Sequence, residues 1–89
     1  MTNLSYTYIL LCKDNTLYTG WTVNLDKRIK THNLGKASKY TRARLPVKLV
    51  YYESFENKID AQKREYAIKQ LTRKQKLELI ESFNFTQYL

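Results

Sequence analysis

The sequence is poor in several features on which whole classes of protein depend. Cys12 is its one cysteine, which excludes an internal disulfide framework and any zinc site built on cysteines. No apolar run approaches the roughly 18 residues that a membrane span needs. The start, Met1–Leu4, lacks the basic and then apolar segments of a secretion signal. We therefore expect a reduced, cytoplasmic protein with no membrane partner.

Acidic residues are also scarce. The 89 residues include 16 Lys and Arg against 8 Asp and Glu, which gives a net charge of +8. Such an excess on a small body favours a polyanionic partner, most often nucleic acid, although basic charge can also serve solubility alone. A hydrophobic content of 43% is enough for a compact core, so disorder is not expected. The length predicts one domain over residues 1–89, with its core at about 5–80.

The alternation of apolar and turn-forming segments predicts an α+β fold. Asp14 and Asn15 favour a hairpin turn, Asn24 and Asn57 are suitable helix caps, and Gly35 to Pro46 reads as a basic loop. Expected strands cover 5–12, 17–22 and 47–53, and expected helices run from 25 to near 35, from 58 to 71 and from 72 onward. The order β-β-α-β-α-α with a three-stranded antiparallel sheet flanked by helices defines the class.

Two tyrosine tripeptides lie on the arms of the predicted hairpin. They are Tyr6-Thr7-Tyr8 and Tyr18-Thr19-Gly20. Whether Tyr18 shares a sheet face with Tyr8 depends on the hairpin register, because a shift of one residue moves Tyr18 to the other face. The sequence does not fix this register. A glycine inside a strand often marks a close approach by another group. Taken singly, each tyrosine is equally consistent with an aromatic that packs in a strand.

Three polar helix residues are candidates for chemistry. Arg28 and His32 are one turn apart on the border of the apolar stripe of their helix, so both should lean towards the sheet. Arg28 could hold a phosphate or lie on the surface, and His32, the only histidine, could be catalytic or simply half-buried. Glu65 could bind a divalent cation through its carboxylate or form a salt bridge with Lys69.

The basic loop has the composition of a strip that follows a nucleic-acid backbone. Its cations would neutralise phosphates, and its aromatic ring could stack on a base; a solvated loop is the alternative. The residues are Lys36, Lys39, Tyr40, Arg42 and Arg44.

Together these residues resemble the GIY-YIG nuclease superfamily, and more narrowly a small bacterial group of uncharacterised proteins that consist of this domain alone. The family tyrosines match Tyr8 and Tyr18, with Tyr-Thr in place of the family's Gly-Ile, as in this subgroup. Its helix arginine matches Arg28, its histidine or tyrosine matches His32, and its glutamate matches Glu65. The subgroup signature HN-x-GK-x-x-KYT is present at 32–41.

The resemblance implies a mechanism. Glu65 would hold one Mg²⁺ or Mn²⁺, bound weakly without substrate, and the ion would stabilise the departing 3′ oxygen. Tyr8, with its pKa lowered by the metal and the cationic surroundings, would help to deprotonate the attacking water. Tyr18 and His32 would orient that water, and Arg28 would stabilise charge on the phosphate.

The predicted function is a divalent-metal-dependent endonuclease that hydrolyses phosphodiester bonds of DNA or another nucleic acid. Family members that cut specific DNA carry this module beside separate DNA-binding or repair domains. With 89 residues, we expect weak, salt-sensitive binding with little sequence readout, and a homodimer or partner protein could add specificity. The alternatives are a nucleic-acid-binding module with little or no turnover and, after it, a protein-interaction factor.

Overall fold

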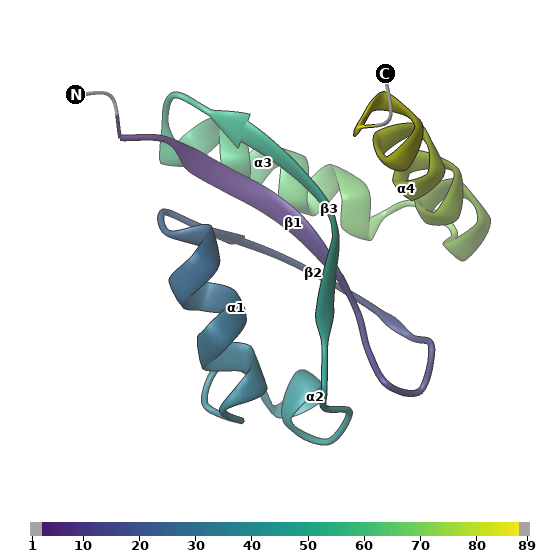
Figure 1. Cartoon of the computed structure of the whole chain (residues 1–89). Coiled ribbons are helices and arrows are strands. Elements are labelled where there is room, and N and C mark those ends of the chain that lie inside the picture. Colours follow the sequence, from purple (N-terminus) through teal and green to yellow (C-terminus); the bar gives the residue numbers. More distant parts are fainter. Residues whose placement is uncertain (1–2, 88–89) are drawn as a thin grey trace.

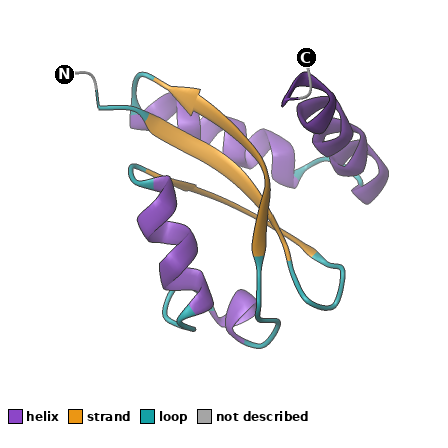
Figure 2. Cartoon of the chain, viewed as in Figure 1, coloured by secondary structure: helices purple, strands orange, loops and turns teal. Residues whose placement is uncertain are grey.

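The computed structural model describes residues 3–87, with side chains up to Phe83. A three-stranded antiparallel sheet of order β2-β1-β3 lies between two layers of helices (Figures 1 and 2). The elements are β1 (Ser5–Leu11), β2 (Leu17–Thr22), α1 (Leu25–Asn33), α2 (Lys39–Arg42), β3 (Lys48–Phe55), α3 (Lys58–Lys69) and α4 (Arg73–Gln87). The predicted α+β class and order are confirmed, with the short α2 added between α1 and β3. No helix within residues 3–87 is long and apolar enough to cross a membrane.

The central strand β1 is buried on both faces, which explains its nearly continuous apolar sequence. Tyr8 and Leu10 pack with Ile29 in one core cluster, on the face covered by α1. Ile9 points the other way and packs with Ile68 of α3 and other residues of a second cluster. The sheet therefore separates two small cores, each closed by its own pair of helices.

The hairpin register places both tyrosine tripeptides in a shared frame. Tyr8 lies opposite Gly20, and Leu10 lies opposite Tyr18. Residues directly opposite one another in an antiparallel pair share a face, so Tyr8 and Tyr18 are on the same side of the sheet. The turn that sets this register has Asn15 at φ 67°, which asparagine tolerates better than most residues.

Helix ends follow the local chemistry of the sequence. The side chains of Asn24 and Asn57 accept hydrogen bonds from Lys27 N and Asp60 N, as predicted. Thr72 and Gln75 form a reciprocal capping box at the start of α4. These caps fix where α1, α3 and α4 begin, and with them the places of the polar side chains that the helices carry.

The prediction of a continuous loop from Gly35 to Pro46 is wrong at Lys39–Arg42. The hydroxyl of Ser38 accepts a hydrogen bond of 3.1 Å from the backbone N–H of Thr41. That N-cap starts the single turn of α2 and buries the Thr41 side chain completely. The cap was readable from the sequence, since serine is among the preferred N-cap residues.

A buried hydrogen bond ties β1 to α3. The Thr7 hydroxyl donates to the backbone oxygen of Ala61 over 2.7 Å, and both residues are fully buried. Glu65 lies one turn further along α3, so this bond helps to set the position of its carboxylate relative to the sheet.

We predict that Thr7→Val lowers the free energy of unfolding by about 1–2 kcal/mol, because it leaves a buried carbonyl without this donor. Urea denaturation measures the change. Thr31→Val is the matched control, since the Thr31 hydroxyl also donates to a helix carbonyl, Lys27 O, but at an exposed position. An equal decrease in the free energy of unfolding for the two variants would contradict a special role for the buried hydrogen bond between Thr7 and Ala61.

Candidate active site

Tyr8 and His32 form a buried pair between the sheet and α1. The Tyr8 hydroxyl oxygen lies 2.8 Å from His32 Nε2, and the two residues are 1% and 0% exposed. On the other side of the imidazole, Nδ1 lies 2.9 Å from the Thr41 hydroxyl, which in turn contacts Ser38. Both ring nitrogens are therefore partnered, and a chain of polar groups runs from α2 to β1.

Gly20 makes room for the Tyr8 hydroxyl. A Cβ atom at this position would lie 2.5 Å from the Tyr8 hydroxyl oxygen and 3.3 Å from the ring of Tyr18. The first of these is closer than any real Cβ contact, so a side chain here would push Tyr8 away from His32. The glycine of the second tripeptide is thus required by the tyrosine of the first.

Arg28 supplies a cationic donor beside this pair. Its Nε is buried and has no hydrogen-bond partner among the described residues. A buried N–H without a partner is costly, and a guanidinium is suited to phosphate oxygens. Its charge also acts on both Tyr8 and His32. Arg28 is thus placed to donate to an anion that enters the site.

Burial and the arginine keep His32 neutral. Removal from water, and then the nearby Arg28 charge, lower the pKa of His32 from 6.5 to about 4. At neutral pH the imidazole therefore has one nitrogen free to accept a proton, and the Tyr8 hydroxyl is the group that faces Nε2.

The pKa of Tyr8 is raised, contrary to the lowering that cationic surroundings were expected to give. Burial is the largest cause, and the neighbouring Arg28 offsets it only in part. Tyr8 is therefore a protonated hydroxyl at neutral pH unless a further positive charge or a proton acceptor assists it.

Tyr18 lies on the open side of the pair. Its ring is half-buried and meets the His32 ring edge-on, with 5.2 Å between centroids. On the other side it stacks on Tyr40, at 6.0 Å and an angle of 27°. Tyr18 therefore links the buried polar pair to the surface.

Glu65 lies on α3, which packs on the face of the sheet opposite to α1. Burial is the main cause of the raised pKa of Tyr8, and the Glu65 charge is the last of the smaller causes. Glu65 also forms the salt bridge with Lys69 that the sequence suggested, at 3.3 Å. Within residues 3–87 no three His, Cys, Asp or Glu side chains gather as a metal cage. A single carboxylate completed by water and phosphate oxygens fits the way proteins hold Mg²⁺.

The structure divides the predicted basic strip. The Tyr40 ring stacks on Tyr18 and also contacts the Arg44 guanidinium, whose carbon lies 3.9 Å from the ring centroid. Arg44 is further held by Asp14, at 3.0 Å. Tyr40 and Arg44 thus already have partners within the chain. Of the cations in the predicted strip, Lys36, Lys39 and Arg42 remain exposed.

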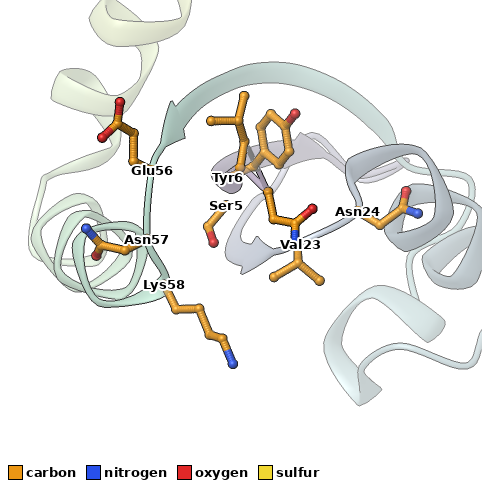
Figure 3. Close-up of a pocket in the computed structure, with 9 residues that line it drawn as sticks. Ser5, Tyr6, Val23, Asn24, Glu56, Asn57 and Lys58 are labelled. Carbon is orange, nitrogen blue, oxygen red and sulfur yellow. The ribbon is translucent and has the colours of Figure 1, made fainter. Parts of the chain in front are cut away.

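A hollow of about 700 Å³ lies away from this polar cluster. Its lining comes from the start of β1, the β2–α1 connection and the β3–α3 connection (Figure 3). It contains none of the predicted site residues. The polar cluster is therefore distinguished by its chemistry and not by the depth of a pocket.

The fold is a small α+β domain that carries tyrosine, arginine, histidine and glutamate on its sheet and the flanking helices. The family model of the GIY-YIG catalytic domain matches residues 4–78, and the chain belongs to this family.

Its relatives identify the bacterial subgroup. The chain is 68% identical over 79 residues to a UPF0213 protein of Clostridium perfringens, covering 89% of this chain and 85% of that one. A UPF0213 protein of Bacillus halodurans, solved by NMR, is 46% identical with a TM-score of 0.57, over 88% of this chain and 83% of that chain. An E. faecalis protein, also solved by NMR, is 40% identical with a TM-score of 0.61, over 96% and 93%. The predicted group of small bacterial proteins is confirmed.

Thr41 is the site residue that sequence reasoning missed. Its hydroxyl holds His32 Nδ1 and its side chain is fully buried. The signal was available in two parts, the Ser38 cap and the threonine three residues later, but only the folded chain brings Thr41 beside the imidazole.

We predict that the imidazole of His32 titrates near pH 4 in the folded protein. It is the only histidine, so an NMR titration needs no assignment. The unfolded chain binds this proton below about pH 6.5, whereas the folded chain resists it down to about pH 4. The free energy of unfolding should therefore be fully retained above pH 6.5 and fall by about 3 kcal/mol between 6.5 and 4.

His32→Gln is the control for this prediction, because it removes the titrating group. Its stability should lack this component of the pH dependence while retaining the contributions of the carboxylates. A wild-type imidazole that titrates near 6.5 would contradict the buried, neutral state.

Proposed function

We propose that the protein is a divalent-metal-dependent endonuclease that hydrolyses phosphodiester bonds of nucleic acid, with DNA as the first substrate to test. One observation carries the proposal: a buried tyrosine hydroxyl lies 2.8 Å from a neutral histidine, beside an arginine whose Nε has no partner among the described residues. Membership of the GIY-YIG catalytic family supports the same chemistry. The net charge of +8 favours the polyanionic substrate.

Tyr8 and His32 would act as one proton acceptor. With the imidazole proton on Nδ1 and donated to Thr41, Nε2 accepts from the Tyr8 hydroxyl. The Tyr8 oxygen can then take a proton from the attacking water while its own proton moves to Nε2. Tyr8 can act in this way although its pKa is raised, because the two proton transfers are coupled and no free phenolate has to form before the attack.

The other residues would bind and orient the phosphate. Arg28 donates to a non-bridging oxygen, where negative charge increases in the transition state. Tyr18 lies at the mouth of the site and positions the water. Glu65 would hold a divalent cation, which when bound supplies Lewis-acid stabilisation of the phosphate and of the leaving 3′ oxygen. Water attacks phosphorus, the bond to the 3′ oxygen breaks, and that oxygen takes a proton from solvent, which leaves a 5′-phosphate and a 3′-hydroxyl.

The Lys69–Glu65 salt bridge favours one alternative, a nucleic-acid-binding module with little or no turnover. Lys69 competes with the cation for the Glu65 carboxylate. In that case the protein would bind nucleic acid in a salt-dependent manner and cleave none in Mg²⁺ or Mn²⁺.

We predict that Tyr8→Phe slows cleavage of plasmid and single-stranded DNA by about 10²–10⁴-fold, the usual worth of a positioned acid–base group. Tyr6→Phe is the matched control, because it removes a hydroxyl from the same strand and face and should leave the rate within a few-fold. Circular dichroism and thermal unfolding verify that both variants fold. Cleavage that persists unchanged in Glu65→Gln and Arg28→Ala would reject the assignment.

A further inference from the structure

A second hollow crosses the outer edge of β2 and has no role in the mechanism above. It has a volume of about 260 Å³. Its lining combines one exposed end of the aromatic stack with two lysines from α3 and α4, and consists of Leu17, Tyr18, Thr19, Tyr40, Lys69 and Lys76.

Thr19 gives this hollow an unsatisfied polar group. The residue is 5% exposed, and its hydroxyl oxygen is buried with no hydrogen-bond partner among the described residues. The great majority of buried hydroxyls are paired, so one that is not requires an explanation. A ligand oxygen seated in the hollow would supply the missing partner.

The charges around the hollow select an anion. Lys69 and Lys76 both line it, and the first turn of α4 has no acidic residue that could offset their charges. The positive end of the α4 dipole lies at this same turn and adds to the positive potential. Lys76 has no salt bridge among the described residues that could cancel its charge.

We propose that this hollow binds a backbone phosphate of the substrate strand next to the scissile one, an inference that rests on the proposed function. Tyr18 lines the hollow and also meets His32 edge-on, so the two sites share a wall. Lys76 and the Thr19 hydroxyl donate to the phosphate. Lys69 lies between the hollow and Glu65, and on moving to the phosphate it would release the carboxylate for the cation.

The substrate strand would therefore leave the active site over the edge of β2 towards the α3–α4 turn. This path differs from the one predicted from sequence, which followed the basic segment between α1 and β3. In this arrangement Tyr40, whose ring contacts both Tyr18 and Arg44, would support Tyr18.

We predict that Lys76→Gln weakens binding of a fluorescein-labelled single-stranded DNA oligonucleotide and lowers the slope of log K against log salt by about 0.7, the loss of one phosphate contact. Fluorescence anisotropy in EDTA measures binding without cleavage. Lys74→Gln is the matched control, because it removes the same charge from the same helix turn but lies outside the hollow. Its slope should equal that of the wild type.

Thr19→Val tests the neutral donor separately. It should weaken binding without changing the salt slope, because no charge is removed. Equal slopes for the wild type, Lys76→Gln and Lys74→Gln would overturn the subsite, even if cleavage depends on Glu65 and the proposed function stands. A slope change specific to Lys76 in a protein that cleaves nothing would uphold the subsite and reject the nuclease. No binding by the wild type would reject both.

Discussion

The hydrogen bond between Tyr8 and His32 is the interaction on which the site depends. It joins the central strand to α1 across the sheet face, and it is possible only because Gly20 leaves space beside the Tyr8 hydroxyl. Thr41 then holds the far side of the imidazole, which couples α2 to the same strand. The two tripeptides for which GIY-YIG domains are named thus meet in one contact, between Tyr8 of the first and Gly20 of the second.

The charged groups around this contact differ in whether they have a partner within the chain. Arg28 has a buried donor without a partner among the described residues, and its charge helps to keep His32 neutral. Glu65, the nearby carboxylate, is paired with Lys69. An incoming phosphate would satisfy Arg28, and a divalent cation would replace Lys69. Under the proposed function, substrate and metal would therefore arrive together.

Local signals in the sequence account for most of the fold. Asn24, Asn57 and the Thr72–Gln75 pair mark three helix starts because capping acts over only a few residues. The hairpin register could not be predicted, since either face of the Tyr18 strand satisfies the same alternation. Long-range contacts were equally out of reach, and the Arg44–Asp14 salt bridge that holds Arg44 over Tyr40 spans thirty positions. The direction of the Tyr8 pKa also depends on burial, which only the packed structure reveals.

A crystal structure of the protein with Mn²⁺ and a slowly cleaved phosphorothioate oligonucleotide would show metal, phosphate and Tyr8 together, because anomalous scattering locates the ion independently of the protein atoms. Mn²⁺ should bind the Glu65 carboxylate at about 2.1 Å, as other small divalent cations do. Lys69 should have left that carboxylate, Arg28 Nε should donate to the same phosphate, and the Tyr8 oxygen should face the water in line with the scissile bond. A manganese ion bound elsewhere, with Glu65 still paired to Lys69 and the phosphate remote from Tyr8, would contradict it.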